Sequence, residues 1–252
     1  MIFRSVLFNV VFYLNLSCYM VAALPTLLLP YRYLRALAKA WAGSNLWLLR
    51  VICSIGVDFR GLEKIPRGGL ILASKHQSAW ETFALLLLVE DPVFILKREL
   101  MWIPLFGWCL WKADMIPVDR SARGPALAAM TERARSTIQR GRQIIIFPEG
   151  TRRAPGAEPQ YKSGVAHLYA ETGAPCVPVA LNSGLFWPRR SFRRFPGTVR
   201  VEILDPIEPG LDKRAFVERL RTQIETATAR LVEEGMRELG RNAPRYPGSG
   251  DA

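Results

Sequence analysis

Short runs of apolar residues alternate along this 252-residue chain with longer segments in which apolar residues recur every three or four positions. Runs of the first kind predict buried strands, and segments of the second kind predict packed helices. The predicted strands cover 69–73, 92–96, 115–118, 143–147, 176–181 and 199–204. The predicted helices cover 82–89, 126–140, 162–172 and 212–239, and 101–108 is an aromatic helix or hairpin that faces either the core or a membrane. Strands that alternate with helices predict an α/β fold, here a single domain with a mixed, partly parallel sheet flanked by helices.

The N-terminal stretch 5–31 contains no charged residue. At ~1.5 Å per residue, a helix of this length could cross a hydrocarbon core of ~30 Å, so we expect a membrane anchor. A cleaved signal peptide is the alternative, which Arg4 favours, but the apolar run exceeds the ~7–15 residues of a usual signal-peptide core. Because Pro25 and Pro30 can break the helix, we expect the segment to be membrane-embedded without necessarily spanning the bilayer.

Basic residues follow this stretch at Arg32, Arg35, Lys39 and Arg50. Such a bias predicts that the body of the protein lies on the cytoplasmic side of the inner or cell membrane. The expected layout is membrane-embedded and interfacial helices at 1–58, an α/β domain at 59–240 and a flexible tail at 241–252.

The formal net charge of +12 indicates an anionic partner, which could be nucleic acid, an anionic membrane or a phosphorylated substrate. The four cysteines are far apart, and neither they nor the histidines have the spacing of metal ligands. We therefore expect no metal, no cofactor and no disulfide framework.

His76 is one of only two histidines and lies between the strand at 69–73 and the helix that follows it. Ser78 and Glu81 fit a capping box at the start of that helix. A histidine in the preceding loop can fold back over the first turn toward Glu81, and the carboxylate would then fix the imidazole tautomer and leave the other ring nitrogen free to accept a proton. The alternative is that Glu81 only caps the helix and His76 is an ordinary polar loop residue.

Charged residues also follow two other predicted strands. Lys97 and Arg98 come after 92–96, and Pro148-Glu149-Gly150-Thr151-Arg152 comes after 143–147. Because the carboxyl ends of parallel strands share one edge of the sheet, we expect these residues to converge with His76. The guanidinium of Arg152 suits a phosphate, although Glu149 and Arg152 could instead form a structural ion pair or turn.

Taken together, these stretches resemble the glycerolipid acyltransferase family. His76-x4-Glu81 resembles its His-x4-Asp motif with glutamate in place of aspartate, and Lys97-Arg98-Glu99-Leu100 resembles its second motif. Phe147-Pro148-Glu149-Gly150-Thr151-Arg152 resembles the third motif, and Val177-Pro178-Val179-Ala180 the fourth. All four occur in the family's order within about 60–205.

The resemblance implies a membrane-bound enzyme of phospholipid biosynthesis. It would transfer a fatty acyl group from acyl-CoA or acyl-carrier protein to the free sn-2 hydroxyl of lysophosphatidic acid, giving phosphatidic acid. His76 would be the general base and Glu81 would orient it. Lys97, with Arg98 beside it, and Arg152 would hold the acceptor phosphate, and Glu149, Gly150 and Thr151 would shape the pocket for its glycerol. A relative acting on another lysolipid, such as lyso-ornithine lipid or a lysophospholipid with a larger headgroup, is the alternative.

A non-enzymatic reading starts from the segment 186–195, where aromatic residues and arginines interleave as in proteins that bind single-stranded nucleic acid. A membrane-anchored basic module could bind nucleic acid or anionic lipid through such a segment. The apolar N-terminal stretch favours the lipid, with the rings at the acyl boundary and the guanidinium groups on headgroups, so no nucleic-acid partner is expected.

Overall fold

The computed structural model describes residues 1–119 and 125–240, so the tail expected at 241–252 lies outside the described residues. Within these ranges seven strands form one sheet in the order β1-β7-β6-β2-β5-β3-β4. The strands are β1 (Ile55–Arg60), β2 (Leu70–Ser74), β3 (Pro92–Lys97), β4 (Ile116–Val118), β5 (Gln143–Ile146), β6 (Cys176–Leu181) and β7 (Gly197–Ile203). Only β6 and β7 pair antiparallel, so the predicted mixed, partly parallel sheet is confirmed.

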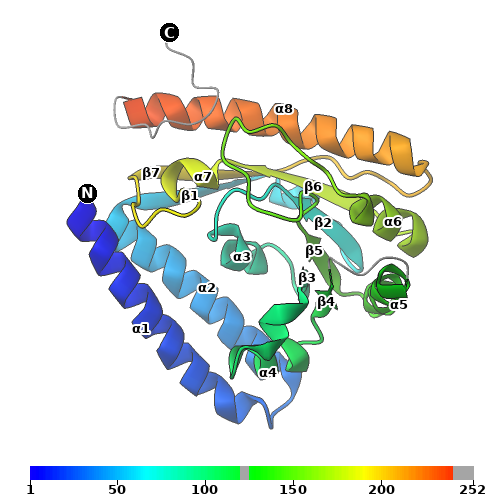
Figure 1. Ribbon diagram of the computed structural model, residues 1–252, viewed down its shortest axis with the longest axis horizontal. Coiled ribbons are helices and arrows are strands. Elements are labelled where there is room, and N and C mark those ends of the chain that lie inside the picture. Colours follow the sequence, from blue (N-terminus) through cyan, green and yellow to red (C-terminus); the bar gives the residue numbers. More distant parts are fainter. Residues whose placement is uncertain (120–124, 241–252) are drawn as a thin grey trace.

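Helices cover both faces of the sheet (Figure 1). The long helices are α1 (Ile2–Thr26), α2 (Tyr31–Cys53), α5 (Pro125–Gln139), α6 (Ser163–Thr172) and α8 (Lys213–Leu239). The short elements are η1 (Leu62–Lys64), α3 (Glu81–Ala84), η2 (Leu85–Leu87), η3 (Arg98–Trp102), α4 (Phe106–Lys112) and α7 (Ser183–Phe186). Asp212 caps α8 as predicted, because its carboxylate accepts the backbone N–H groups of Arg214 and Ala215.

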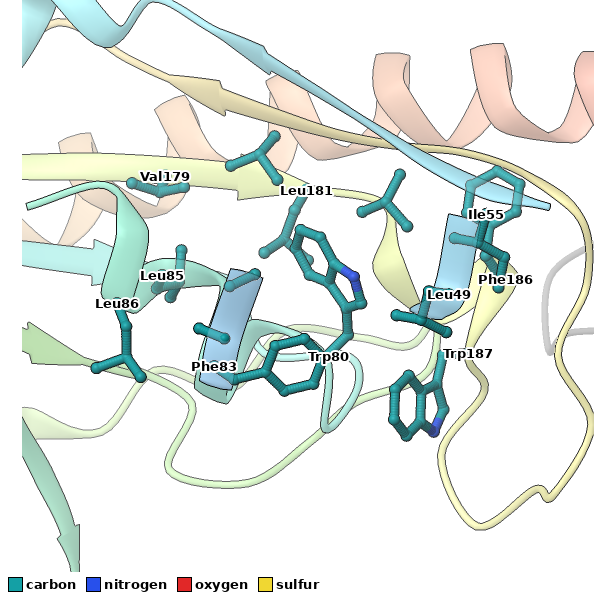
Figure 2. Packing of buried hydrophobic residues seen from close by; sticks show 14 of the residues in the cluster. Leu49, Ile55, Trp80, Phe83, Leu85, Leu86, Val179, Leu181, Phe186 and Trp187 are labelled. Carbon is teal, nitrogen blue, oxygen red and sulfur yellow. The ribbon is translucent and has the colours of Figure 1, made fainter. Parts of the chain in front are cut away.

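Alternate residues of the central strands build two cores. Leu70 and Leu72 of β2 join the core under α2 and α3, whereas Ile71 and Ala73 join the core under α5, α6 and α8. Figure 2 shows the first core, where Trp80 and Phe83 lie beneath Leu181 of β6. Because both faces of β2 are buried, the strand is apolar from Leu70 to Ala73, and the loop that follows Ser74 begins between the two cores.

The helix α1 is long and apolar enough to cross a membrane, by length and composition. It nevertheless packs on α2, and Pro30 makes the break between them as the N-cap of α2. Two of its polar side chains bond to the segment that contains Phe192 and Arg194. Asn9 donates to the carbonyl of Phe192 at 3.2 Å, and the hydroxyl of Ser5 accepts the N–H of Arg194 at 2.9 Å. The hairpin of α1 and α2 is therefore docked along the α/β domain.

The strand β1 was missing from the predicted strands, and it crosses the domain boundary expected at residue 58. Its residues alternate between apolar and polar, as in an edge strand, but they follow the apolar α2 without an intervening Gly or Pro. The break is made by Ser54, whose left-handed backbone (φ 54°) ends α2.

The interpretation of 186–195 as an interfacial loop with its rings at an acyl boundary was wrong for most of its rings. Phe186, Trp187 and Phe195 are at most 8% exposed, and only Phe192 remains half-exposed. Arg194 is also buried, with its guanidinium 3.9 Å from the Trp187 ring centroid, and this burial lowers its pKa to about 10. Arg194 and Trp187 therefore fix the segment to α1 and do not form a stacking platform, whereas Arg189, Arg190 and Arg193 stay exposed.

Phe8→Ala is expected to destabilise the protein by about 3–5 kcal/mol, because it removes a fully buried ring that packs edge-to-face on Trp187. Phe3→Ala, the same change at a ring of α1 that is 77% exposed, should leave the free energy of unfolding nearly unchanged. Denaturant unfolding in detergent measures both variants. Equal effects would contradict a docked α1.

Candidate active site

The carboxyl end of β2 carries the predicted catalytic pair. Glu81 is fully buried, and one of its oxygens lies 3.1 Å from Nδ1 of His76 and 2.7 Å from the N–H of Ser78. The same oxygen accepts the N–H of Gln77, and the other oxygen accepts the hydroxyl of Ser183 at 2.8 Å. An ionised carboxylate only accepts hydrogen bonds, so the proton of a neutral His76 belongs on Nδ1 and the lone pair of Nε2 is free to accept a proton.

The capping box is present in part. Glu81 accepts the N–H of Ser78 as predicted, but the Ser78 hydroxyl accepts the N–H of Trp80 at 3.2 Å. The helix itself is short: α3 begins at Glu81 and passes into the 3-10 turn η2 at Leu85. The main structural role of the Glu81 carboxylate is therefore to hold the loop that contains His76, and capping the short α3 is secondary.

The imidazole of His76 stacks on the Phe147 ring, with a centroid distance of 3.9 Å and an interplanar angle of 15°. Both rings line an apolar cavity of about 310 Å³. The cavity walls come from α1, α2, β3 and α4, and they include Leu16, Met20, Leu34, Trp41, Phe94, Phe106 and Leu110. A titratable group at the side of an apolar cavity is the usual arrangement of a site for a small, partly apolar ligand.

Glu149 lies beneath this site and is 1% exposed. Its carboxylate bonds to the Lys75 ammonium at 2.9 Å and accepts the backbone N–H of His76 at 3.3 Å. Burial raises the pKa of Glu149, and the charge of Lys75 opposes that rise. Glu149 therefore holds the backbone of the loop that contains His76, and both of its carboxylate oxygens already have partners.

Lys97 lines the same cavity as His76 and pairs with Glu99 at 2.9 Å, with half of its side chain exposed. Arg98 does not line the cavity. Its guanidinium lies 3.4 Å from Asp119 and over the Trp102 ring, 5.5 Å from the centroid. Two residues of the second motif therefore lie in different places. Lys97 lies at the cavity, whereas Arg98 lies along η3.

Gly150, Thr151 and Arg152 form the turn after β5. Gly150 has φ +66°, a conformation that glycine adopts without strain, and its N–H bonds to the carbonyl of Phe147 at 2.9 Å. Thr151 and Arg152 are exposed and do not line the cavity. Within the described part of the chain, the Arg152 guanidinium has no hydrogen bond or ion pair, so it is available to an anion.

Sequence reasoning missed Lys75, Phe147 and Ser183 as parts of the site. Phe147 was visible as the first residue of the third motif, but its stacking on His76 was not. Ser183 follows β6, and its position at the carboxyl end of a strand beside β2 was the available signal. Nothing in the sequence paired Lys75 with its carboxylate partners.

Residues 56–182 match the model of the acyltransferase family. The 1-acyl-sn-glycerol-3-phosphate acyltransferase of Pseudomonas aeruginosa is 38% identical over 177 residues, which cover 70% of this chain and 69% of the relative. The mouse 1-acyl-sn-glycerol-3-phosphate acyltransferase alpha is 29% identical over 195 residues, which cover 74% of this chain and 68% of the relative. The crystal structure of the 1-acyl-sn-glycerophosphate (LPA) acyltransferase of Thermotoga maritima superposes with a TM-score of 0.73 at 26% identity, covering 93% of this chain and 97% of that one. The chain belongs to the acyltransferase family.

Proposed function

We propose that this enzyme transfers a fatty acyl group from a thioester to the free sn-2 hydroxyl of lysophosphatidic acid, giving phosphatidic acid. The observation that carries the proposal is the His76–Glu81 pair at the side of an apolar cavity. The names of its relatives, which are 1-acyl-sn-glycerol-3-phosphate acyltransferases, support this acceptor. Acyl-CoA or acyl-carrier protein would be the donor, since both present a thioester.

In this mechanism Nε2 of His76 takes the proton of the acceptor hydroxyl while its oxygen attacks the thioester carbonyl. The buried charge of Glu81 stabilises the imidazolium that forms. When the tetrahedral intermediate collapses, the new C–O ester bond remains, the C–S bond breaks and the thiolate leaves. The imidazolium returns its proton to that sulfur, so His76 ends neutral and no acyl-enzyme is needed.

The cavity beside His76 supports a place for an acyl chain, because its walls are almost wholly apolar. Lys97 at the cavity and the unpaired guanidinium of Arg152 would bind the acceptor phosphate, with Arg98 adding positive charge nearby. Gly150 and Thr151 would shape the turn against the glycerol. Glu149 supports the site from below, because its carboxylate is held by Lys75 and the His76 backbone.

We also propose that the hairpin of α1 and α2 lies in one leaflet of a membrane. The outward face of α1 exposes Phe3, Val6, Val10, Leu14 and Val21. The exposed Trp108 and Trp111 extend this surface, because they line a hollow together with Leu27 at the end of α1, and Trp102 is exposed as well. Because Asn9 and Ser5 bond α1 to the body, insertion as an interfacial element keeps contacts that spanning would break.

The basic residues after α1 give less support to the cytoplasmic side than the sequence indicated. Arg35 pairs with Asp91 at 3.2 Å, and Lys39 donates to the carbonyl of Val89 at 2.6 Å, so both serve to hold α2. Arg32 and Arg50 remain exposed. A body on the cytoplasmic side stays our proposal, because acyl-CoA and acyl-carrier protein are soluble cytoplasmic donors. The layout of hairpin and acyltransferase domain is part of the same proposal, with the boundary moved from 58 to Ser54, because β1 belongs to the sheet of the domain.

The function is tested by incubating the purified protein with lysophosphatidic acid, a lysophospholipid with a larger headgroup and lyso-ornithine lipid, each with acyl-CoA and with acyl-carrier protein. We expect phosphatidic acid as the main product and a loss of about 10²–10⁴ in turnover for His76→Ala. His167→Ala, a change at the other histidine, should keep the wild-type turnover. Near-normal turnover of a folded His76→Ala protein would refute the mechanism.

Glu81→Gln should keep the fold, because the amide oxygen can still accept the loop N–H groups and its NH₂ can donate to the Ser183 oxygen. It loses the charge that stabilises the imidazolium, so turnover should fall by about 10²–10⁴-fold, the range of a positioned acid–base group. Glu81→Asp keeps the charge but is one methylene shorter, and it should retain part of the rate. Thermal melting and turnover of both variants are the measurements. If Glu81→Gln kept the wild-type turnover, Glu81 would have only a structural role as a helix cap.

Arg152→Ala should raise the acceptor KM by about tenfold or more, the value of a hydrogen bond to a charged group, and leave the donor KM unchanged. Arg190→Ala, at another exposed arginine, is the matched control. An equal rise in both KM values would remove Arg152 from the acceptor site.

A further inference from the structure

Lys75 is a buried cation next to the catalytic histidine, and only 3% of its surface is exposed. Its ammonium lies 2.9 Å from Oε1 of Glu149 and 2.8 and 3.0 Å from the two oxygens of Glu225. An ammonium group has three N–H donors, so these contacts use all of them. The orientation of the Lys75 side chain is therefore set by two carboxylates.

The Glu149 carboxylate carries this network to the active site. While Oε1 faces Lys75, Oε2 accepts the backbone N–H of His76 at 3.3 Å. The carbonyl of the same residue, which belongs to the next peptide unit, is also held, because it accepts the N–H of Arg153 at 2.8 Å. The backbone of His76 thus depends on where the Glu149 carboxylate lies.

Glu225 comes from α8, outside the matched residues 56–182. The Tyr161 hydroxyl donates to it at 2.9 Å, and its side chain is 26% exposed in an open groove between α6 and α8. Glu149 and Glu225 both carry a negative charge next to the Lys75 ammonium. Because Glu225 is partly hydrated, its charge can help to hold the ammonium in place while the ammonium keeps its contact with the buried Glu149.

We propose that Glu225 is a positioning residue for His76, acting through Lys75 and Glu149. The inference rests on the proposed role of His76 as the base. In a Glu225→Gln protein the ammonium loses the charge of its second carboxylate, and one of its three acceptor oxygens becomes an amide NH₂ that cannot accept. The ammonium can then turn toward the groove, and Glu149 loses the contact that fixes its carboxylate beside the His76 N–H. A misplacement of about 1 Å at a reacting group can cost roughly 10²-fold in rate.

The test compares Glu225→Gln with Glu218→Gln, the same change at an exposed glutamate of α8 that lines the same groove. We expect kcat of Glu225→Gln to fall by about tenfold or more, with both KM values within about twofold of wild type. Hydrogen exchange at the His76 amide should become faster. Glu218→Gln should change neither quantity.

A double-mutant cycle with Glu149→Gln separates positioning from general destabilisation. If Glu225 acts through Glu149, Glu225→Gln should slow the Glu149→Gln enzyme by less than twofold. In that enzyme the carboxylate that links Lys75 to the His76 N–H is already missing. Additive losses, or wild-type kcat and amide exchange in Glu225→Gln, would overturn the proposal. If the wild-type protein acylated none of the lysolipids, the proposed function would be refuted instead. The rate of hydrogen exchange at the His76 amide, compared between Glu225→Gln and Glu218→Gln, would still show whether Glu225 positions His76.

Discussion

The buried carboxylate of Glu81, which pairs with no lysine or arginine among residues 1–119 and 125–240, is the constraint on which the site depends. Glu81 is fully buried, and its charge is stabilised by the N–H groups of a tight loop, by the Ser183 hydroxyl and by His76. Each of these donors must point at the Glu81 carboxylate, so the loop after β2 and the start of α7 have to lie next to each other. The orientation of the imidazole follows from that arrangement, and so does the free nitrogen on its other side.

Much of this arrangement could be predicted from local patterns. The strands after which His76, Lys97 and Glu149 stand are short apolar runs with turn residues, and runs of that kind depend little on distant parts of the chain. Parallel pairing then brings their carboxyl ends to one edge. The pairing of His76 with Glu81 was also predictable, because it joins residues five positions apart.

The remaining features depend on contacts between distant residues, which periodicity does not reveal. Glu225 reaches Lys75 across 150 positions of the sequence. Arg194 looked like a surface charge, but the aromatic rings of Trp187 and Phe8 bury it against α1. The edge strand β1 escaped notice because a single serine with a left-handed backbone, Ser54, separates it from α2. In each case the tertiary structure overrides what the local sequence favours.

The apolar cavity is built by two stretches of the chain with different structural duties. His76 and Phe147 come from the matched domain, whereas Leu16, Met20 and Leu34 come from the hairpin that precedes it. None of these hairpin residues bonds to the loop that holds His76. The dimensions of the cavity can therefore change through substitutions in the hairpin while the geometry of the His76–Glu81 pair stays constant. Under the proposed function, chemistry and ligand size would then be separable traits of one polypeptide.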